Sequence, residues 1–195
     1  GVGADATLAI AKNAAKKRRE GDDRYMVLAQ VNNQVPRSRG MNYLHISEIT
    51  ALVEQDQDLA VLPDTPPMTP EEELIGRYCA EFVKDGSTIQ LGIGSIPNAV
   101  AQAFLDTHVQ DLGVHSEMAC DTMINLWEAE IITNRRKTFM PYRSIFTFAM
   151  GTRKLYDWID DNPGVEFYPV DFVNNPHNIG KNDNLVSINA CLQVD

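Results

Sequence analysis

The residues best suited to chemistry are His115 and Glu117, in the segment DLGVHSEM (111–118). The segment reads as a strand, and the alternation of side chains then places His115 and Glu117 on the same side. Glu117 would lie at the carboxyl end of this strand, where open α/β sheets present their ligands. Apolar neighbours such as Val114 and Met118 would leave its carboxylate less hydrated and more nucleophilic. The alternative is a carboxylate held in a structural salt bridge.

A glycine loop upstream is the second candidate site, formed by Gly92, Ile93, Gly94 and Ser95. It follows an apolar strand and opens a helix at Pro97, whose free N–H groups can face an anion. Two glycines let the backbone turn tightly and approach a ligand closely. The loop lacks the third glycine of the dinucleotide fingerprint and the Lys-Ser/Thr of a Walker loop. An anion site and a tight turn without a ligand both remain open.

Other catalytic and metal sites find little support in the spacing of reactive residues. A metal site at His115 lacks a second histidine at ligand spacing, so none is expected. Cys120 has no obvious histidine partner, and a buried thiol is expected there. Ser95 is not part of a G-x-S-x-G elbow, which argues against a serine hydrolase. Three widely spaced cysteines predict reduced thiols in a reducing compartment.

Alternating helical and strand-like segments predict an α/β fold with a mostly parallel sheet flanked by helices. Four prolines within residues 59–72 indicate a linker, and we place a domain boundary near residue 66. Residues 45–56 suit either a helix or a strand followed by a helix. Helices are expected at 5–19, 70–84, 97–105, 120–132 and 152–163. Strands are expected at 25–32 (buried), 87–94, 111–118, 143–151, 165–174 and 184–194.

Composition limits the class of protein further. The 195 residues carry a formal net charge of −10, which argues against a general nucleic-acid binder. No apolar run of transmembrane length and no signal-peptide pattern occurs, so we expect no membrane partner and a cytoplasmic location. An organelle protein whose targeting segment is absent is the alternative. The first residue is not Met and the last stretch is strand-like, so a fragment of a longer protein is expected.

Several separated stretches resemble the acetyl-CoA hydrolase/transferase family, closest to its 4-hydroxybutyrate and butyryl CoA-transferase branch. These stretches are GSTIQLGIGSIPNAV, LGVHSEMACD, the IITN turn, GTRKLYDWIDDNPGVEFYPVDFVNNP and KNDNLVSINACLQVD. AQVNNQVPRSRG and HISEI resemble the end of the family's N-terminal domain. The resemblance spans nearly the whole chain, with the motifs in the family's order.

The resemblance implies two similar α/β domains. Residues 1–66 would hold the C-terminal part of the first domain and the linker, and 67–195 the N-terminal part of the second. His115-Ser116-Glu117-Met118 matches the family's H-[ST]-E-[MV] motif, which makes Glu117 the implied nucleophile. Glu117 would form an acyl-glutamyl anhydride and then a glutamyl-CoA thioester. Coenzyme A and acyl-CoA would be substrates, with a carboxylic acid as acceptor and no permanently bound cofactor or metal.

The same resemblance implies roles for other residues. The loop Gly92, Ile93, Gly94 and Ser95 would line the substrate and CoA site, with Gln30 and Asn32 facing the same cleft. The family's S-D-G is replaced here by Cys120-Asp121-Thr122, and Thr122 would narrow specificity if that glycine permits close approach of substrate. The family also suggests a homodimer or larger oligomer.

Two alternatives to a CoA-transferase stay open. A hydrolase on the same scaffold would let water resolve the glutamyl thioester. The family's G-x-G-G-Q/S loop would follow residue 195, so a non-catalytic fragment is the other alternative.

Overall fold

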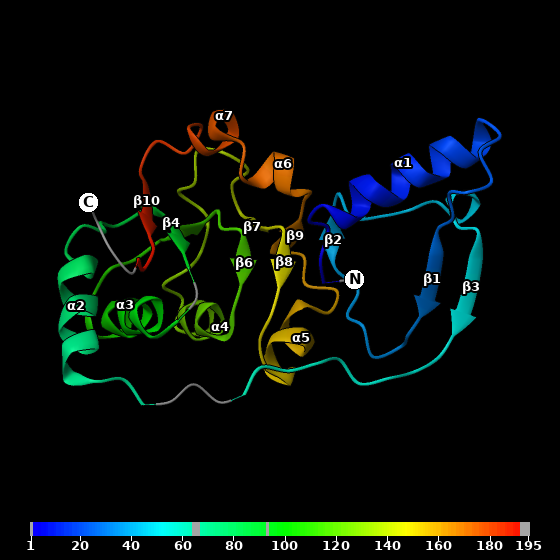
Figure 1. The fold of residues 1–195 in the computed structure, drawn as a ribbon. Coiled ribbons are helices and arrows are strands. Elements are labelled where there is room, and N and C mark those ends of the chain that lie inside the picture. Colours follow the sequence, from blue (N-terminus) through cyan, green and yellow to red (C-terminus); the bar gives the residue numbers. More distant parts are fainter. Residues whose placement is uncertain (1, 64–66, 93, 192–195) are drawn as a thin grey trace.

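Every strand pair in the described part of the chain is parallel. The structure is a computed structural model that describes residues 2–63, 67–92 and 94–191 (Figure 1). Its strands are β1 (Leu28–Val31), β2 (Arg39–Gly40), β3 (Ala51–Glu54), β4 (Thr88–Leu91), β5 (Gly113–Val114), β6 (Met118–Ala119), β7 (Ser144–Phe146), β8 (Phe148–Ala149), β9 (Val165–Phe167) and β10 (Leu185–Ile188). Its helices are α1 (Thr7–Arg19), the 3-10 helix η1 (Ile46–Glu48), α2 (Pro70–Ala80), α3 (Ser95–Asp106), α4 (Asp121–Glu128), α5 (Arg153–Ile159), α6 (Val170–Val173) and α7 (Pro176–Ile179).

The strands near Glu117 form two neighbouring three-stranded sheets, in the orders β10-β4-β5 and β7-β9-β2. An isolated parallel bridge between His115 and Ile145 joins β5 to β7, and β6 pairs with β8. Figure 1 shows α2 to α5 along one side of these strands and α6 and α7 along the other. The predicted α/β fold, with mostly parallel strands flanked by helices, is therefore confirmed.

The core lies between these strands and helices α2 to α5. Phe104, Phe146 and Phe167 are its largest fully buried side chains. Burying an aromatic side chain of this size stabilises a fold by about 1.5–3 kcal/mol. The elements that carry Glu117 therefore rest on the best-packed part of the described chain.

The residues predicted to start α2 and to end α1 lie at those helix ends in the structure. Thr69 caps α2 and forms a capping box with Glu72, while Pro70 occupies the first helical position. Helix α2 ends at Ala80, four residues before the predicted end. Helix α1 ends in a basic turn, and Gly21 follows with a φ of 96° that disfavours a side chain.

Two predicted strands divide because the chain changes partner within each of them, and a helix cuts a third one short. Residues 111–118 divide into β5, paired with β4, and β6, paired with β8, with Glu117 in the bend between them. Residues 143–151 divide into β7 and β8 at Thr147, whose N–H donates to the carbonyl of Glu117. In 165–174 only β9 is a strand, because Pro169 then starts α6.

The predicted burial of residues 25–32 is wrong. Among the strands of the described residues, β1 pairs only with β3, and Leu28 is 69% exposed. A two-stranded sheet has too few neighbours to bury its apolar residues. Figure 1 shows this pair beside α1 and apart from the other strands. Residues 45–56 form η1 and then β3, so both predicted alternatives, a helix and a strand followed by a helix, are wrong.

Parts of residues 1–66 nevertheless pair with the later strands. Strand β2 pairs with β9, and the N–H of Ala4 donates to the carbonyl of Thr147. The N–H of Leu62 donates to the carbonyl of Gly151 below α5. Residues 64–66 lie outside the described residues, and the domain boundary near residue 66 stays a prediction.

Candidate active site around Glu117

The main chain of Glu117 is held from two directions. Its carbonyl accepts hydrogen bonds from the N–H groups of Thr147 (2.8 Å) and Phe148 (3.2 Å). The preceding residue, Ser116, donates its N–H to Ile145 and its hydroxyl to the carbonyl of Leu91 (3.1 Å). The bend that presents Glu117 is therefore fixed by β4 on one side and by the β7–β8 link on the other.

The carboxylate of Glu117 lies at a cavity of about 310 Å³. The Nδ2 group of Asn174 donates a 2.6 Å hydrogen bond to its Oε2 atom. Apolar side chains line part of the cavity, namely Val173, Ile179 and Leu185. Three neutral polar side chains that hydrogen-bond to one another also line it, namely Gln90, Ser187 and Asn189.

Glu117 is exposed in this chain, contrary to the prediction that its neighbours reduce its hydration. Val114 and Met118 are buried, but their side chains point into the core while that of Glu117 points toward the cavity. Alternation along the chain separates the apolar neighbours from the carboxylate. The predicted same-side placement of His115 and Glu117 agrees with the structure, since both line the cavity.

His115 is buried and both ring nitrogens are engaged. Nε2 lies 2.8 Å from the carbonyl of Val173, and Nδ1 lies 3.3 Å from Nδ2 of Asn182. A carbonyl only accepts, so Nε2 carries the proton and Nδ1 accepts from the Asn182 amide. Burial lowers the pKa of His115 below its ordinary value, against the hydrogen bond to Val173. A neutral His115 therefore ties β5 to the segment that carries Asn174.

Stability should consequently fall as the pH drops below about 6.5, the ordinary pKa of histidine in an unfolded chain. The unfolded chain binds a proton there that folded His115 resists, because burial keeps the pKa of His115 low. The stability that neutral His115 provides is fully present above pH 6.5. It declines as the pH falls from 6.5 toward the lower pKa of His115 in the folded state. The thermal midpoint measured between pH 5 and 8 should show this slope in the wild type. A His115→Gln variant that keeps the same acid-side slope would contradict the prediction.

Removing the Asn174 amide should slow chemistry at Glu117 without unfolding the protein. Asn174 is exposed, and its side chain orients the carboxylate through the 2.6 Å bond. We expect Asn174→Ala to lower the rate of any reaction at Glu117 by about tenfold. Asn125, exposed on α4, provides the matched Asn→Ala control. A fall in thermal midpoint that accounts for the lost rate would count against an orienting role.

The glycine loop lies next to this site. Gly92 donates its N–H to Ile188, and a Cβ on Gly92 would come within 3.0 Å of Oδ1 of Asn189 in the cavity wall. Gly94, with φ of 115°, is the N-cap of α3 and has no side chain to cap it. This leaves first-turn N–H groups without a side-chain acceptor, as an anion site requires. Ile93 lies outside the described residues.

Ser95 begins α3 and makes a different contact. A hydrogen bond with its side chain is the main cause that lowers the pKa of Glu72, in the capping box of α2. The serine hydroxyl thus joins α2 to α3. Its predicted role in substrate binding stays a prediction.

Gln30 and Asn32 do not line the Glu117 cavity. Their side-chain amides donate to the carbonyls of Gln55 (2.8 Å) and Gln57 (2.7 Å), respectively, in the segment after β3. Gln30 in β1 and Asn32 directly after β1 therefore hold the segment that follows β3 against this part of the chain. Their predicted contact with substrate stays a prediction.

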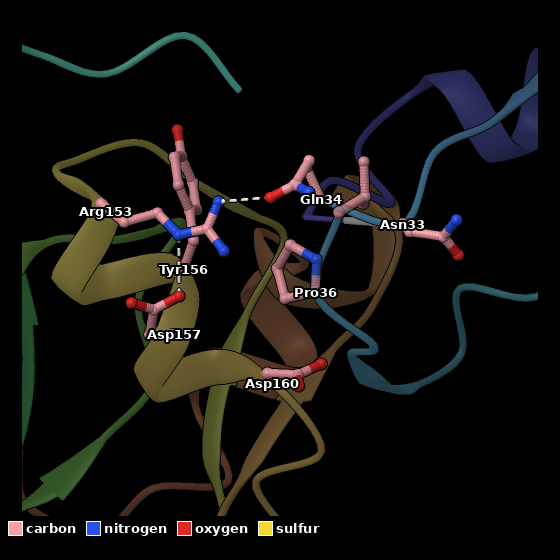
Figure 2. A pocket seen from close by; sticks show the side chains of 8 residues that line it. Asn33, Gln34, Pro36, Arg153, Tyr156, Asp157 and Asp160 are labelled. Carbon is pink, nitrogen blue, oxygen red and sulfur yellow. Dashed lines mark hydrogen bonds and ion pairs between the residues drawn. The ribbon is translucent and has the colours of Figure 1, made fainter. Parts of the chain in front are cut away.

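A second cavity, of about 160 Å³, lies where residues 33–36 meet α5 (Figure 2). Arg153 donates to Gln34 (3.1 Å) and to Asp157 (2.8 Å) there, and Asp160 accepts from the N–H of Arg37. The charged side chains that line this cavity therefore already have hydrogen-bond partners within the chain. At the larger cavity, by contrast, the Glu117 carboxylate faces the open space and accepts a hydrogen bond from the Asn174 amide.

Within the described residues, no three His, Cys, Asp or Glu side chains lie together in a way that would hold a metal ion. All three cysteines are free thiols, and burial raises the pKa of Cys120. Sequence reasoning missed Asn174, Gln90 and Asn189. Their amides carry no motif of their own, and all three residues lie in segments that the sequence predicts as strands.

Relatives of known name match almost the whole chain. A succinyl-CoA:cyclohexane-1-carboxylate CoA transferase of Geobacter metallireducens is 47% identical over 189 residues, which is 97% of this chain and 41% of that protein. Residues 151–195 match the model of the acetyl-CoA hydrolase/transferase C-terminal domain. By these matches the chain is similar to named CoA transferases and, at residues 151–195, to the acetyl-CoA hydrolase/transferase C-terminal domain. It spans less than half the length of the relatives it matches.

Two further named proteins and a solved structure titled RipA are also similar to this chain. The 4-hydroxybutyrate coenzyme A transferase of Clostridium kluyveri is 48% identical over 170 residues, covering 87% of this chain and 39% of that protein. The crystal structure of 4-hydroxybutyrate CoA-transferase from Porphyromonas gingivalis has a TM-score of 0.87 and 39% identity, covering 100% of this chain and 46% of that one. The RipA structure from Yersinia pestis has a TM-score of 0.88 and 38% identity, over 100% and 42% of the two chains.

Proposed function

We propose that the protein containing this chain transfers coenzyme A between a short-chain acyl-CoA and a carboxylic acid. The observation that carries the proposal is the Glu117 carboxylate, presented by a fixed bend at a cavity and held at one oxygen by Asn174. The named relatives act on CoA thioesters and carboxylates, which supports the same substrate classes here.

The proposed reaction uses Glu117 as a covalent nucleophile. A carboxylate oxygen attacks the thioester carbonyl, the C–S bond breaks, and CoA leaves as a thiolate with the bonding electron pair. The thiolate then attacks the glutamyl carbonyl of the anhydride and releases the first acid as a carboxylate. The carboxylate of a second acid then attacks the glutamyl-CoA thioester and forms a new anhydride. The freed CoA thiolate attacks the acyl carbonyl of this anhydride, which releases the new acyl-CoA and the Glu117 carboxylate. Every intermediate forms by acyl transfer, so the scheme requires neither a metal nor a bound cofactor.

The contacts of the site suit this sequence. Asn174 holds Oε2, and among the contacts of the described residues Oε1 is the carboxylate oxygen without a partner. Oε1 is therefore the oxygen we assign to the attack. The first turn of α3, with Gly94 at its N-cap, offers N–H groups for an anionic part of the substrate.

The proposal is tested with the full-length protein, incubated with acetyl-CoA and analysed by mass spectrometry after borohydride or hydroxylamine treatment. Modification of the peptide that contains Glu117 is the expected result. Absence of any modification in the active full-length protein would overturn the covalent scheme.

A hydrolase on the same scaffold is favoured by one observation, the solvent exposure of Glu117 in this chain. Labelled acetate separates the two functions. A transferase incorporates the label into acetyl-CoA, whereas a hydrolase releases free CoA with no acid acceptor present.

We further infer a homo-oligomer in the cytoplasm, as the family resemblance and the three free thiols suggest. None of the helices in the described ranges is long and apolar enough to cross a membrane. Light scattering of the full-length protein and cell fractionation test the two inferences.

A further inference from the structure

Within the described ranges, strand β5 has no neighbouring strand on one side just before it reaches the active site. On the other side, Gly113 and His115 donate their N–H groups to the carbonyls of β4 and the residue before it. The peptide groups of Val114 face β7 instead. Main-chain hydrogen bonding to β7 begins only two residues later, where the N–H of Ser116 donates to the carbonyl of Ile145 (3.0 Å). Both peptide groups of Val114 therefore need partners from elsewhere.

Two side chains from the turn after α4 supply these partners. Oδ1 of Asn134 accepts the N–H of Val114 (2.9 Å), and Nζ of Lys137 donates to the carbonyl of Val114 (2.9 Å). Each also reaches the β7 side: Asn134 donates to the hydroxyl of Ser144 (2.9 Å), and Lys137 to the carbonyl of Arg143 (2.7 Å). We call this pair the Asn134–Lys137 wedge.

The wedge is enclosed. Asn134 is 1% exposed and Lys137 4% exposed. The stem of Lys137 crosses Gly113, where an added Cβ would lie 2.3 Å from its Cγ atom. The space between β5 and β7 is thus built around an amine that donates to two neutral carbonyls.

An amine in this position changes charge near neutral pH. Burial lowers the pKa of Lys137 to about 7, although the nearby carboxylate of Glu166 acts to raise it. Arg143 and Tyr168 hydrogen-bond to that carboxylate from the residue before β7 and from the end of β9. On the β5 side the ionisable neighbour is His115, whose own pKa the Lys137 ammonium lowers.

We propose that Lys137 is a positioning residue for Glu117, and that the wedge is closed when its amine is neutral and loosens when it is protonated. A buried ammonium favours local opening because water can solvate the charge. Opening at Val114 releases the strand three residues before Glu117. The inference rests on the proposed function, since it concerns the rate at which Glu117 reacts.

The experiment measures the rate of acyl transfer to Glu117 in the full-length protein, in single turnovers between pH 5.5 and 9. In the wild type the rate should fall by about tenfold as the pH drops through 7. Lys137→Met should abolish this step in the profile. Lys137→Arg stays charged throughout and should remain at the slow acid-side rate. The exposed Lys84, changed to Met, should keep the wild-type profile.

A purely structural lysine would alter the thermal midpoint and leave the shape of the pH profile unchanged, and that result would overturn the inference. If neither variant folds, lysine side chains labelled with ¹³C at Cε provide an NMR titration of the wild type. One lysine should titrate with the same midpoint as the rate, whereas titration of all lysines above about pH 9 would contradict the proposal. Failure of Glu117 to become acylated in the wild type would instead overturn the proposed function.

Discussion

Replacing Glu117 with glutamine should lower the rate of CoA transfer by about 1,000-fold or more, because an amide cannot form the acyl anhydride. Glutamine has nearly the same shape, and its side-chain oxygen can still accept the hydrogen bond from Asn174. The bend itself is held by main-chain bonds to Thr147 and Phe148, which the substitution leaves intact. The loss should therefore appear in the chemical step without a change in the thermal midpoint.

Two further variants sharpen this measurement. Glu117→Asp keeps the charge but withdraws the carboxylate by one methylene, and an activity between those of the wild type and Glu117→Gln is expected. Asp171→Asn removes an exposed negative charge on α6 and should leave the rate close to that of the wild type. Transfer activity that survives in Glu117→Gln would show that another group is the nucleophile.

The Gly40→Ala variant should destabilise the protein by about 2–4 kcal/mol. Gly40 has a φ of 102°, and a Cβ there would lie 2.4 Å from the carbonyl oxygen of Phe167. Phe167 belongs to β9, and its carbonyl also accepts the N–H of Met41 (2.8 Å). An alanine would therefore push β2 away from β9 and weaken the attachment of the N-terminal segment to the central strands.

Gly21→Ala is the matched control for this variant. Gly21 has a similar φ of 96°, but nothing lies within 4 Å of its added Cβ. The control should cost only about 1 kcal/mol, the conformational strain of a left-handed alanine. Urea denaturation measures the free energy of unfolding of both variants. Equal losses in the two variants would mean that the contact with Phe167 contributes nothing.

Local chemistry explains why much of the fold could be predicted. The cap at Thr69, the proline at position 70 and the glycine at position 21 act on the backbone within one turn of themselves, so their effects are the same in any fold. The alternation of apolar segments with helical ones likewise predicted a mostly parallel α/β structure. Glu117 was singled out by its place after an apolar strand and by the motif His115-Ser116-Glu117-Met118.

Contacts between distant parts of the chain could not be read in this way. Whether residues 25–32 are buried depends on what covers β1, and the exposed Leu28 shows that a strand-like composition does not decide it. Residues 111–118 read as one strand, yet they divide because β5 pairs with β4 and β6 pairs with β8.

By itself, the sequence determined most of the elements, the fold class and the carboxylate on which the proposed chemistry depends, because these follow from side-chain type and near neighbours. Only the tertiary structure decided which groups meet that carboxylate. Asn174 lies 57 positions from Glu117, and Lys137 reaches Val114 across 23 positions. Hydrogen bonds of this kind form between segments that folding brings together, so their partners leave no periodic pattern along the chain.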